Sequence, residues 1–261
     1  MIERFVRENV DAQVVRLDLF LKLLEHMFQE AIAHHEPSVS LTLLFASILK
    51  VKQAGRAVQL IAEEGFVEEI LSIGRTLVEV TVNAAYLQYA GETELGRYLH
   101  FHPEAVYQQT GLLRQRKSLG SSSGIVRRIG ELVARGGALV GSRTADPNWT
   151  SRPLIDRAQL ADHASNIPIM ALLVERCYPK GHAAVHGTIQ SLDTFLTTLT
   201  DMGPEQPEDR LNALAEAMFG VNLSLMTLCI YLNNYFHLGM DDSIDLAANA
   251  DSRSRESLEG A

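Results

Sequence analysis

Residues 70–90 read ILSIGRTLVEVTVNAAYLQYA, and apolar residues recur in this stretch at intervals of three and four. An α-helix turns once in 3.6 residues, so this spacing collects apolar side chains on one helical face. The stretch therefore predicts a helix from about Val67 to Ala90. The same period continues through most of the chain, and no segment shows a convincing strand pattern. We expect an all-α fold.

Breaks in this period divide the chain into seven or eight expected helices. Besides the helix above, they cover Val10 to His34, Val39 to Glu64, Glu92 to Leu119, Ile125 to Arg135, Pro153 to Asn166, Pro168 to Thr200 and Arg210 to Leu238. Pro179 and Gly181 are expected to kink or break the segment in which they lie. The GSSSG at 120–124 and the turn-rich stretch 136–153 predict loops, with Trp149 pinning the second loop to the body.

The chain shows no internal repeat and no clear linker, so residues 1–240 are expected to form a single helical bundle. After Gly239 the period and the large apolar residues are lost. We therefore expect residues 241–261 to form a disordered tail.

Composition indicates a folded protein with an acidic surface. Of the 261 residues, 46% are hydrophobic and 21% are charged, far from the signature of disorder. The net charge of −9 argues against broad attraction to a nucleic-acid backbone, although a local basic rim including Arg127 and Arg128 could still steer a polyanion. Cys177 and Cys229 are too few for a disulfide scaffold and favour a reducing cytoplasm.

The segment from Ala217 to Phe236 has the length of a membrane span and carries no formal charge. Asn222, Asn233 and Asn234 dilute its hydrophobicity, so a helix buried in the centre of a bundle is the expectation. The N-terminus carries charges where a signal peptide needs an apolar stretch. These features together predict a cytoplasmic protein with no membrane partner.

Four polar residues interrupt the apolar pattern of the helix quoted above. Arg75, Glu79, Asn83 and Tyr86 follow one another at four, four and three, which aligns them on one face. A charged pair inside a bundle must be hydrogen-bonded and is costly, so such pairs often mark a site. The alternative is a structural Arg75–Glu79 pair that joins helices.

A His-rich segment, ERCYPKGHAAVHGT at 175–188, is the second candidate. His182 and His186 are four apart and would share a helical face, which suits a divalent metal completed by Glu79. Alternatively a histidine acts as general acid and base beside Arg75 or Lys180, which would hold an anion. Histidines hydrogen-bonded in the core are the third interpretation.

Arg176 and His182 also match the short Arg–spacer–His pattern of HEPN-type ribonucleases, which are helical and use no metal. The spacer CYPKG lacks the polar residue that those enzymes usually carry after the arginine. The match is therefore partial.

Three segments together resemble an uncharacterised bacterial family of all-helical proteins, the domain-of-unknown-function family numbered 5677. They are RTLVEVTVNAAYL at 75–87, Trp149 with the short helix after it, and the segment 178–187 that ends in HAAVHG, within a resemblance from about Leu43 to Leu192. Family members carry a second aromatic residue at the position of Pro179 or Lys180 and often a serine near His182. This departure favours His186 over His182, and the family implies no reaction.

The leading hypothesis is a hydrolase or nuclease-like site for a phosphate-containing substrate, either a nucleotide or RNA. In it Arg75 holds the anion, Glu79 orients Arg75 or acts as base, and His186 transfers a proton. Substrate contacts are assigned to Asn83, Tyr86, Lys180 and His182, with no metal or other cofactor. The alternative is a non-catalytic helical binding or assembly module in a defence or regulatory system, and assembly as a homo-oligomer is compatible with both.

Overall fold

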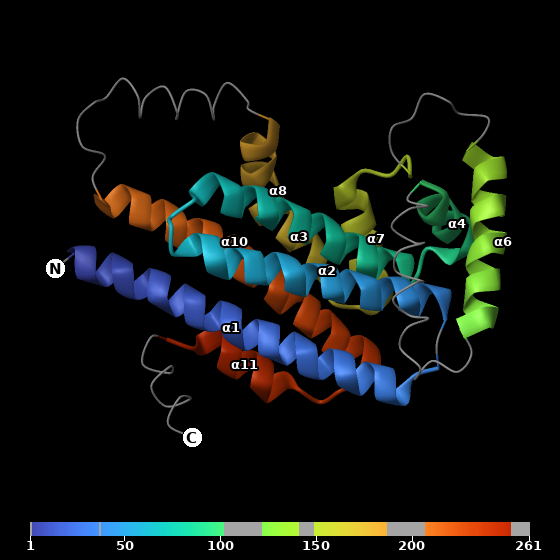
Figure 1. The fold of residues 1–261 in the computed structure, drawn as a ribbon, viewed down its shortest axis with the longest axis horizontal. Coiled ribbons are helices and arrows are strands. Elements are labelled where there is room, and N and C mark those ends of the chain that lie inside the picture. Colours follow the sequence, from blue (N-terminus) through green and yellow to red (C-terminus); the bar gives the residue numbers. More distant parts are fainter. Residues whose placement is uncertain (1, 37, 102–121, 141–148, 187–206, 252–261) are drawn as a thin grey trace.

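The computed structural model describes residues 2–36, 38–101, 122–140, 149–186 and 207–251 (Figure 1). Within these ranges every regular element is an α-helix, which confirms the expected fold class. The nine helices of the described residues are α1 (Ile2–His34), α2 (Val39–Ala62), α3 (Val67–Leu87), α4 (Gly91–Phe101), α6 (Ser122–Val140), α7 (Leu154–Ser165), α8 (Met170–His186), α10 (Pro207–Phe236) and α11 (Asp241–Asn249).

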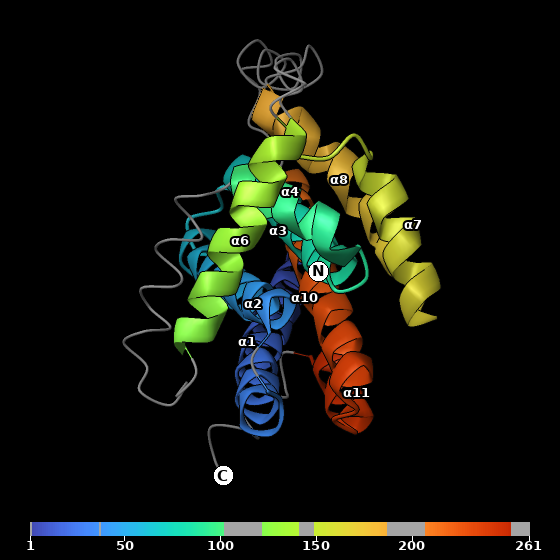
Figure 2. The same cartoon turned by 90° about the vertical axis from the view of Figure 1, so that its right-hand side faces the viewer.

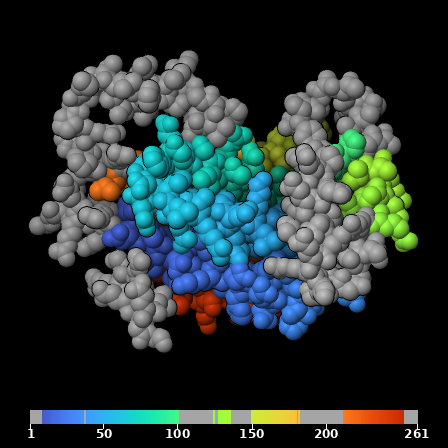
Figure 3. Space-filling model, in the orientation of Figure 1, coloured from blue at the N-terminus to red at the C-terminus, as the bar shows by residue number. Residues whose placement is uncertain are grey.

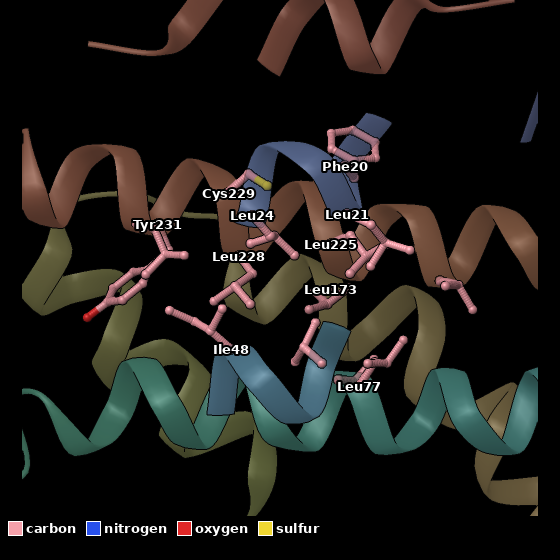
Figure 4. Close-up of a cluster of buried hydrophobic side chains, with 14 of the residues drawn as sticks. Phe20, Leu21, Leu24, Ile48, Leu77, Leu173, Leu225, Leu228, Cys229 and Tyr231 are labelled. Carbon is pink, nitrogen blue, oxygen red and sulfur yellow. The ribbon is translucent and has the colours of Figure 1, made fainter. Parts of the chain in front are cut away.

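The main core forms where α3 and α10 pack together between the other helices. Figure 2 shows α2 on one side of α3, with α7 and α8 on the other. Helices α1, α2, α3, α8 and α10 each contribute a large side chain that is at most 1% exposed, namely Leu24, Ile48, Leu77, Leu173 and Leu228 (Figure 4). Each such burial contributes roughly 1.5–3 kcal/mol to folding. The periodic apolar residues of the sequence therefore meet in one core.

Helix α10 contains a stretch, Leu211–Phe236, that is long and apolar enough to cross a membrane by length and composition. It is the one such stretch among the described residues. In the fold α10 packs along α1 and α3, and its buried residues join the main core. Burial of α10 in the main core therefore accounts for the hydrophobicity of this stretch.

A second, smaller core lies where α4 and α6 pack against each other at the end of α3. Leu95 and Leu99 of α4 contact Ile129 and Leu132 of α6, and Trp149 joins them. This burial explains two corrections to the predicted loops. Helix α6 begins at Ser122 within GSSSG and extends through Gly136 to Val140, because an apolar face that packs on α4 outweighs the low helix propensity of its glycines. Residues 141–148 lie outside the described part of the chain.

The turn between α7 and α8 is held by a single carboxylate. Asp162 is buried, and its two oxygens accept hydrogen bonds from the backbone N–H groups of Ile169, Met170 and Ala171 at 2.7–3.1 Å. These donors have no partner within the first turn of a helix, so the carboxylate caps α8. Asn166 ends α7 in the left-handed conformation, with φ of 57°.

The predicted break at Pro179 and Gly181 is wrong, because α8 runs continuously from Met170 to His186 with Pro179 inside it; a kink there stays a prediction. Proline lacks the N–H that would bond the carbonyl four residues earlier, a loss of roughly 3 kcal/mol in a helix interior. Pro179 lies on the exposed side of α8, while the opposite side packs on α3. Packing therefore outweighs the lost hydrogen bond.

The predicted disorder of the tail is also wrong for residues 241–249, which form α11. Ile244 and Ala247 are buried, and α11 packs on α1 and α10. Asn233 binds the start of α11 by accepting from the Met240 N–H at 2.8 Å and donating to Asp241 at 3.0 Å. The burial of Ile244 and Ala247, together with this capping by Asn233, stabilises a short helix although its sequence shows little apolar periodicity. Residues 252–261 lie outside the described part of the chain.

At Gly181 the backbone of α8 lies directly against α3. Among the glycines whose surroundings are described, this one leaves the least space for a Cβ atom. A Cβ atom there would lie 2.5 Å from both the Arg75 Cβ and the Leu71 carbonyl oxygen. We expect Gly181→Ala to lower the free energy of unfolding by about 1–3 kcal/mol, because the two backbones must separate. Urea unfolding measures this change.

Gly130 provides the matched control, since it is helical and exposed and a Cβ there meets nothing within 4 Å. Gly130→Ala should leave stability unchanged or raise it by up to about 1 kcal/mol. Equal effects of the two substitutions would show that α3 and α8 are not in tight contact.

Tyr231 is 1% exposed, and its hydroxyl points away from the leucine side chains of the core (Figure 4). Burial raises the pKa of this phenol above its ordinary value of 10.0. The unfolded chain therefore loses this proton before the folded protein does, and stability falls once the pH exceeds 10, by up to about 1.4 kcal/mol per pH unit. Below pH 10 Tyr231 adds no pH dependence.

Urea unfolding at pH 8 and pH 10.5 tests this expectation. Tyr231→Phe removes the ionising group, so this variant should lose less stability than the wild type between the two pH values. An identical loss in both proteins would contradict the assignment.

Candidate functional site

The predicted polar face of α3 points at α8. Arg75 Nη2 donates to Glu79 Oε1 at 3.1 Å and contacts the Tyr178 hydroxyl at 3.2 Å. The Tyr178 hydroxyl in turn donates to Glu79 Oε1 at 2.9 Å. The guanidinium carbon of Arg75 also lies 5.2 Å from the centre of the Tyr178 ring. The three side chains thus form a closed triangle of hydrogen bonds, which we call the α3–α8 triad.

The triad is only partly shielded from solvent. The Arg75 side chain is 16% exposed and that of Glu79 is 37% exposed. Burial tends to lower the pKa of Arg75, but the hydrogen bond to Tyr178 and the charge of Glu79 outweigh it, so the pKa is raised. Burial has the opposite effect on the Tyr178 hydroxyl, because it raises the pKa of that group. At neutral pH the triad therefore contains a cation and a neutral phenol.

The two carboxylate oxygens of Glu79 differ. Both hydrogen bonds reach Oε1, and Oε2 makes none with the described residues. Two donors on one oxygen fix the plane of the carboxylate, while the other oxygen can meet solvent. A carboxylate held in this way can accept a proton from a ligand or a water molecule.

One turn further along α3, Asn83 meets α7. Its side-chain oxygen accepts a hydrogen bond from Arg157 Nη1, and the Arg157 guanidinium lies 5.3 Å from the centre of the Trp149 ring. Burial lowers the pKa of Arg157, and this effect exceeds the opposing influence of Glu79 and three tyrosines. Arg157 Nε is buried and has no acceptor among the described residues.

Tyr86, the last residue of the predicted face, is 4% exposed and packs on Trp149 with ring centres 6.1 Å apart. Burial is the main reason that its pKa is raised; Glu94 adds to this, while a hydrogen bond from Arg152 opposes it. Tyr98 meets the same indole edge-on at 5.0 Å. The predicted anchoring role of Trp149, which is 8% exposed, is confirmed.

The positions of the histidines follow from the helix register. Tyr178 contacts Arg75 and Glu79, whereas Gly181 lies against Leu71 and Arg75, so α8 runs antiparallel to α3. Along α8, His182 directly follows Gly181, and His186 is eight residues beyond Tyr178. At 1.5 Å per residue this is roughly 12 Å along the helix axis, in the direction away from Glu79.

The side chains of Lys180, His182 and His186 lie outside the described residues. The proposed convergence of His186 on Arg75 and Glu79 therefore stays a prediction. The structure does bring Arg75 and Glu79 together, at the contact with α8, and it places Asn83 and Tyr86 on the same face of α3. Among the described residues no group of three or more His, Cys, Asp and Glu could hold a metal ion.

Sequence reasoning missed two members of the cluster, Tyr178 and Arg157. Tyr178 lay inside the His-rich segment, but its neighbours drew attention to the histidines. No sequence pattern indicated a role for Arg157, because its helix is short and the residues that it contacts are distant in sequence. Only the packing of α7 on α3 brings it to Asn83.

Two clefts bordered by described residues lie beside the cluster rather than on it. One of about 200 Å³ runs between α8 and α10 and is lined by Arg176, Cys177 and Phe219 among others. The other, of about 420 Å³, lies between α2, α4 and α6. Arg176, the arginine of the partial ribonuclease pattern, is thus exposed toward α10 and not toward the triad.

The proposed basic rim also includes Lys50, Lys52 and Arg56, and three of its described cations pair with acidic residues. Lys52 is buried and pairs with Glu25. Arg127 and Arg128 pair with Glu131, and Arg128 also pairs with Glu92. Figure 3 shows that α1 and α2 form much of the face of the molecule turned toward the viewer. Lys52, Arg127 and Arg128 are therefore neutralised by acidic neighbours.

Comparison with protein families gives one match, to a family of unknown function (DUF5677) over residues 41–203. This region is more than half of the 261 residues. The chain belongs to this family. The DUF5677 region spans α3, α7 and α8, so it contains every residue of the polar cluster. Comparisons with curated proteins and with solved structures found no match.

The triad makes a prediction about stability in this DUF5677 protein. Tyr178→Phe removes one donor to Glu79 and one acceptor from Arg75, and should lower the free energy of unfolding by about 1 kcal/mol. Because both partners meet at Oε1, the effect should not add to that of Glu79→Gln. Urea unfolding of the two single variants and the double variant gives the coupling, expected at about 0.5 kcal/mol or more. Strict additivity would mean that the hydroxyl and the carboxylate do not interact in solution.

Proposed function

We propose that the polar face of α3 is the active site of a hydrolase or nuclease-like enzyme that acts on a phosphate-containing substrate, a nucleotide or RNA. The observation that carries this proposal is the arrangement of Glu79. Its Oε1 is held by Arg75 and Tyr178, its Oε2 makes no bond with a described residue, and the side chain is 37% exposed.

In this proposal Glu79 acts as general base. Oε2 takes the proton from the attacking oxygen, which is that of a water molecule or of a ribose hydroxyl group. The attacking oxygen bonds to phosphorus while the bond from phosphorus to the leaving oxygen breaks. A histidine of α8 donates the proton that the leaving oxygen needs. The backbone of His182 lies roughly 6 Å along α8 from Tyr178 and that of His186 roughly 12 Å, so His182 is the nearer proton donor. Arg75 holds the base in position, and Lys180 and His186 remain candidates for contact with the substrate.

The second candidate is a non-catalytic binding or assembly module, in which the cluster only fixes the packing of α3 against α7 and α8. One observation favours it: Arg75, Glu79 and Tyr178 hydrogen-bond to one another, as a purely structural lock would. A structural lock requires neither an accessible base nor a histidine. The two candidates therefore differ in what a change of charge at Glu79 should do.

Hydrolysis of mononucleotides and of short single-stranded RNA by the purified chain tests the proposal. We expect Glu79→Gln and His182→Ala each to lower kcat at least about 100-fold, the usual contribution of a general acid or base. Glu79→Gln also loses its ion pair with Arg75, so kcat is measured well below the melting temperature of this variant. His186→Ala should have the smaller effect of a substrate contact.

Glu131→Gln is the control, since Glu131 is a comparably exposed carboxylate, 44% against 37%, on a different helix. It should leave kcat unchanged. If the wild type hydrolyses none of these substrates, or if Glu79→Gln keeps full kcat, the enzymatic proposal is wrong and the module becomes the better account.

A further inference from the structure

Arg157 is the charged group of the cluster that the triad does not use. Its described contacts are a hydrogen bond to Asn83, the face of the Trp149 ring and three neutral phenols nearby. Glu79 acts on it only through its charge, because no ion pair joins the two side chains. A guanidinium carries five N–H donors, and here the buried Nε has no acceptor in the described part of the protein.

The cations around α3 differ in whether they have an ion-pair partner among the described residues. Arg75 is paired with Glu79, and Arg97 is paired with Glu94 at 2.6 Å. The charges of Arg152 and Arg157 both act on the Tyr86 hydroxyl, and Arg152 also hydrogen-bonds to it. Neither arginine forms an ion pair with a described residue, although the chain has a net charge of −9.

A cation withdrawn from water without a counter-charge costs free energy, and an anion that binds there recovers it. Guanidinium groups match the oxygens of phosphate, which they bind through two parallel N–H···O bonds. The Trp149 ring lies 5.3 Å from Arg157 Cζ and takes up none of its N–H groups; Nη1 donates to Asn83, and Nε has no acceptor among the described residues. Asn83 and Tyr86 add neutral polar groups beside the guanidinium.

We propose that Arg157, with Arg152 beside it, binds the phosphate group of a ligand on the face of α3 next to Asn83 and Tyr86. Arg75 then serves to position Glu79, and the role of anion ligand that the sequence suggested for Arg75 passes to Arg157. This inference rests on the proposed function and deepens it, because it names the residue that would hold a phosphate group of the substrate on the Asn83 side of Glu79.

Binding to the full chain is measured by thermal shift with four probes: inorganic phosphate, adenosine 5′-monophosphate, adenosine, and a short single-stranded RNA. A ligand that binds only the native state raises the melting temperature in proportion to its occupancy. We expect phosphate and the monophosphate to raise it saturably and adenosine to do so weakly or not at all. Sodium chloride at matched ionic strength corrects for general salt effects.

Arg157→Met keeps an unbranched stem to pack on Trp149 and should weaken the phosphate Kd at least tenfold. Arg157→Lys keeps the charge without the planar fork and should also weaken it. Arg128→Met, on α6, is the control and should leave the Kd unchanged. Without ligand, Arg157→Met should melt at the wild-type temperature or above it, because the variant no longer buries an uncompensated charge.

Several results would overturn the inference. They are an absence of any phosphate-dependent shift in the wild type, an unchanged Kd in Arg157→Met, and equal weakening by Arg128→Met. This outcome is separable from the fate of the proposed enzyme. Phosphate binding through Arg157 without hydrolysis would support the anion site and contradict the proposed catalysis. Hydrolysis with an unchanged KM in Arg157→Met would support the catalysis and contradict the anion site.

Discussion

The close approach of α8 to α3 at Gly181 is the contact on which the polar cluster depends. With hydrogen in place of a side chain, the backbone of α8 can lie against Leu71 and Arg75. Tyr178, one turn earlier on the same helix, then reaches both Arg75 and Glu79. Any larger residue would lift α8 away and leave a charged pair without the phenol that joins it to the neighbouring helix.

The same contact explains how α8 tolerates Pro179. A proline inside a helix removes one hydrogen bond, but α8 is held at both ends of this region by other interactions. Asp162 caps its first turn, and Gly181 packs on α3 beyond the proline. The direction of α8 is therefore set by its neighbours and not by its own hydrogen bonds. That direction determines which residues of the His-rich segment approach Glu79.

The polar face of α3 has two halves with different physical character. Near Arg75 the charges are paired, and the carboxylate of Glu79 keeps one oxygen toward solvent. Near Asn83 and Tyr86 the surroundings are aromatic, and Arg157 is held by a ring and an amide, with no ion-pair partner in the described part of the chain. A base beside such a cation is the arrangement on which the proposed phosphate site depends. It is also the reason that the two halves should be tested separately.

The sequence by itself determined the all-α class, most helix boundaries and the alignment of Arg75, Glu79, Asn83 and Tyr86 on one face of α3, because these depend on a period of 3.6 residues within one segment. Membership in DUF5677 was likewise visible in short local motifs. The tertiary structure alone decided that Tyr178 and Arg157 complete the cluster, that α8 passes through Pro179 and that α11 docks on α1. Each of these follows from contacts between residues far apart in the chain, whose free energies no local pattern records.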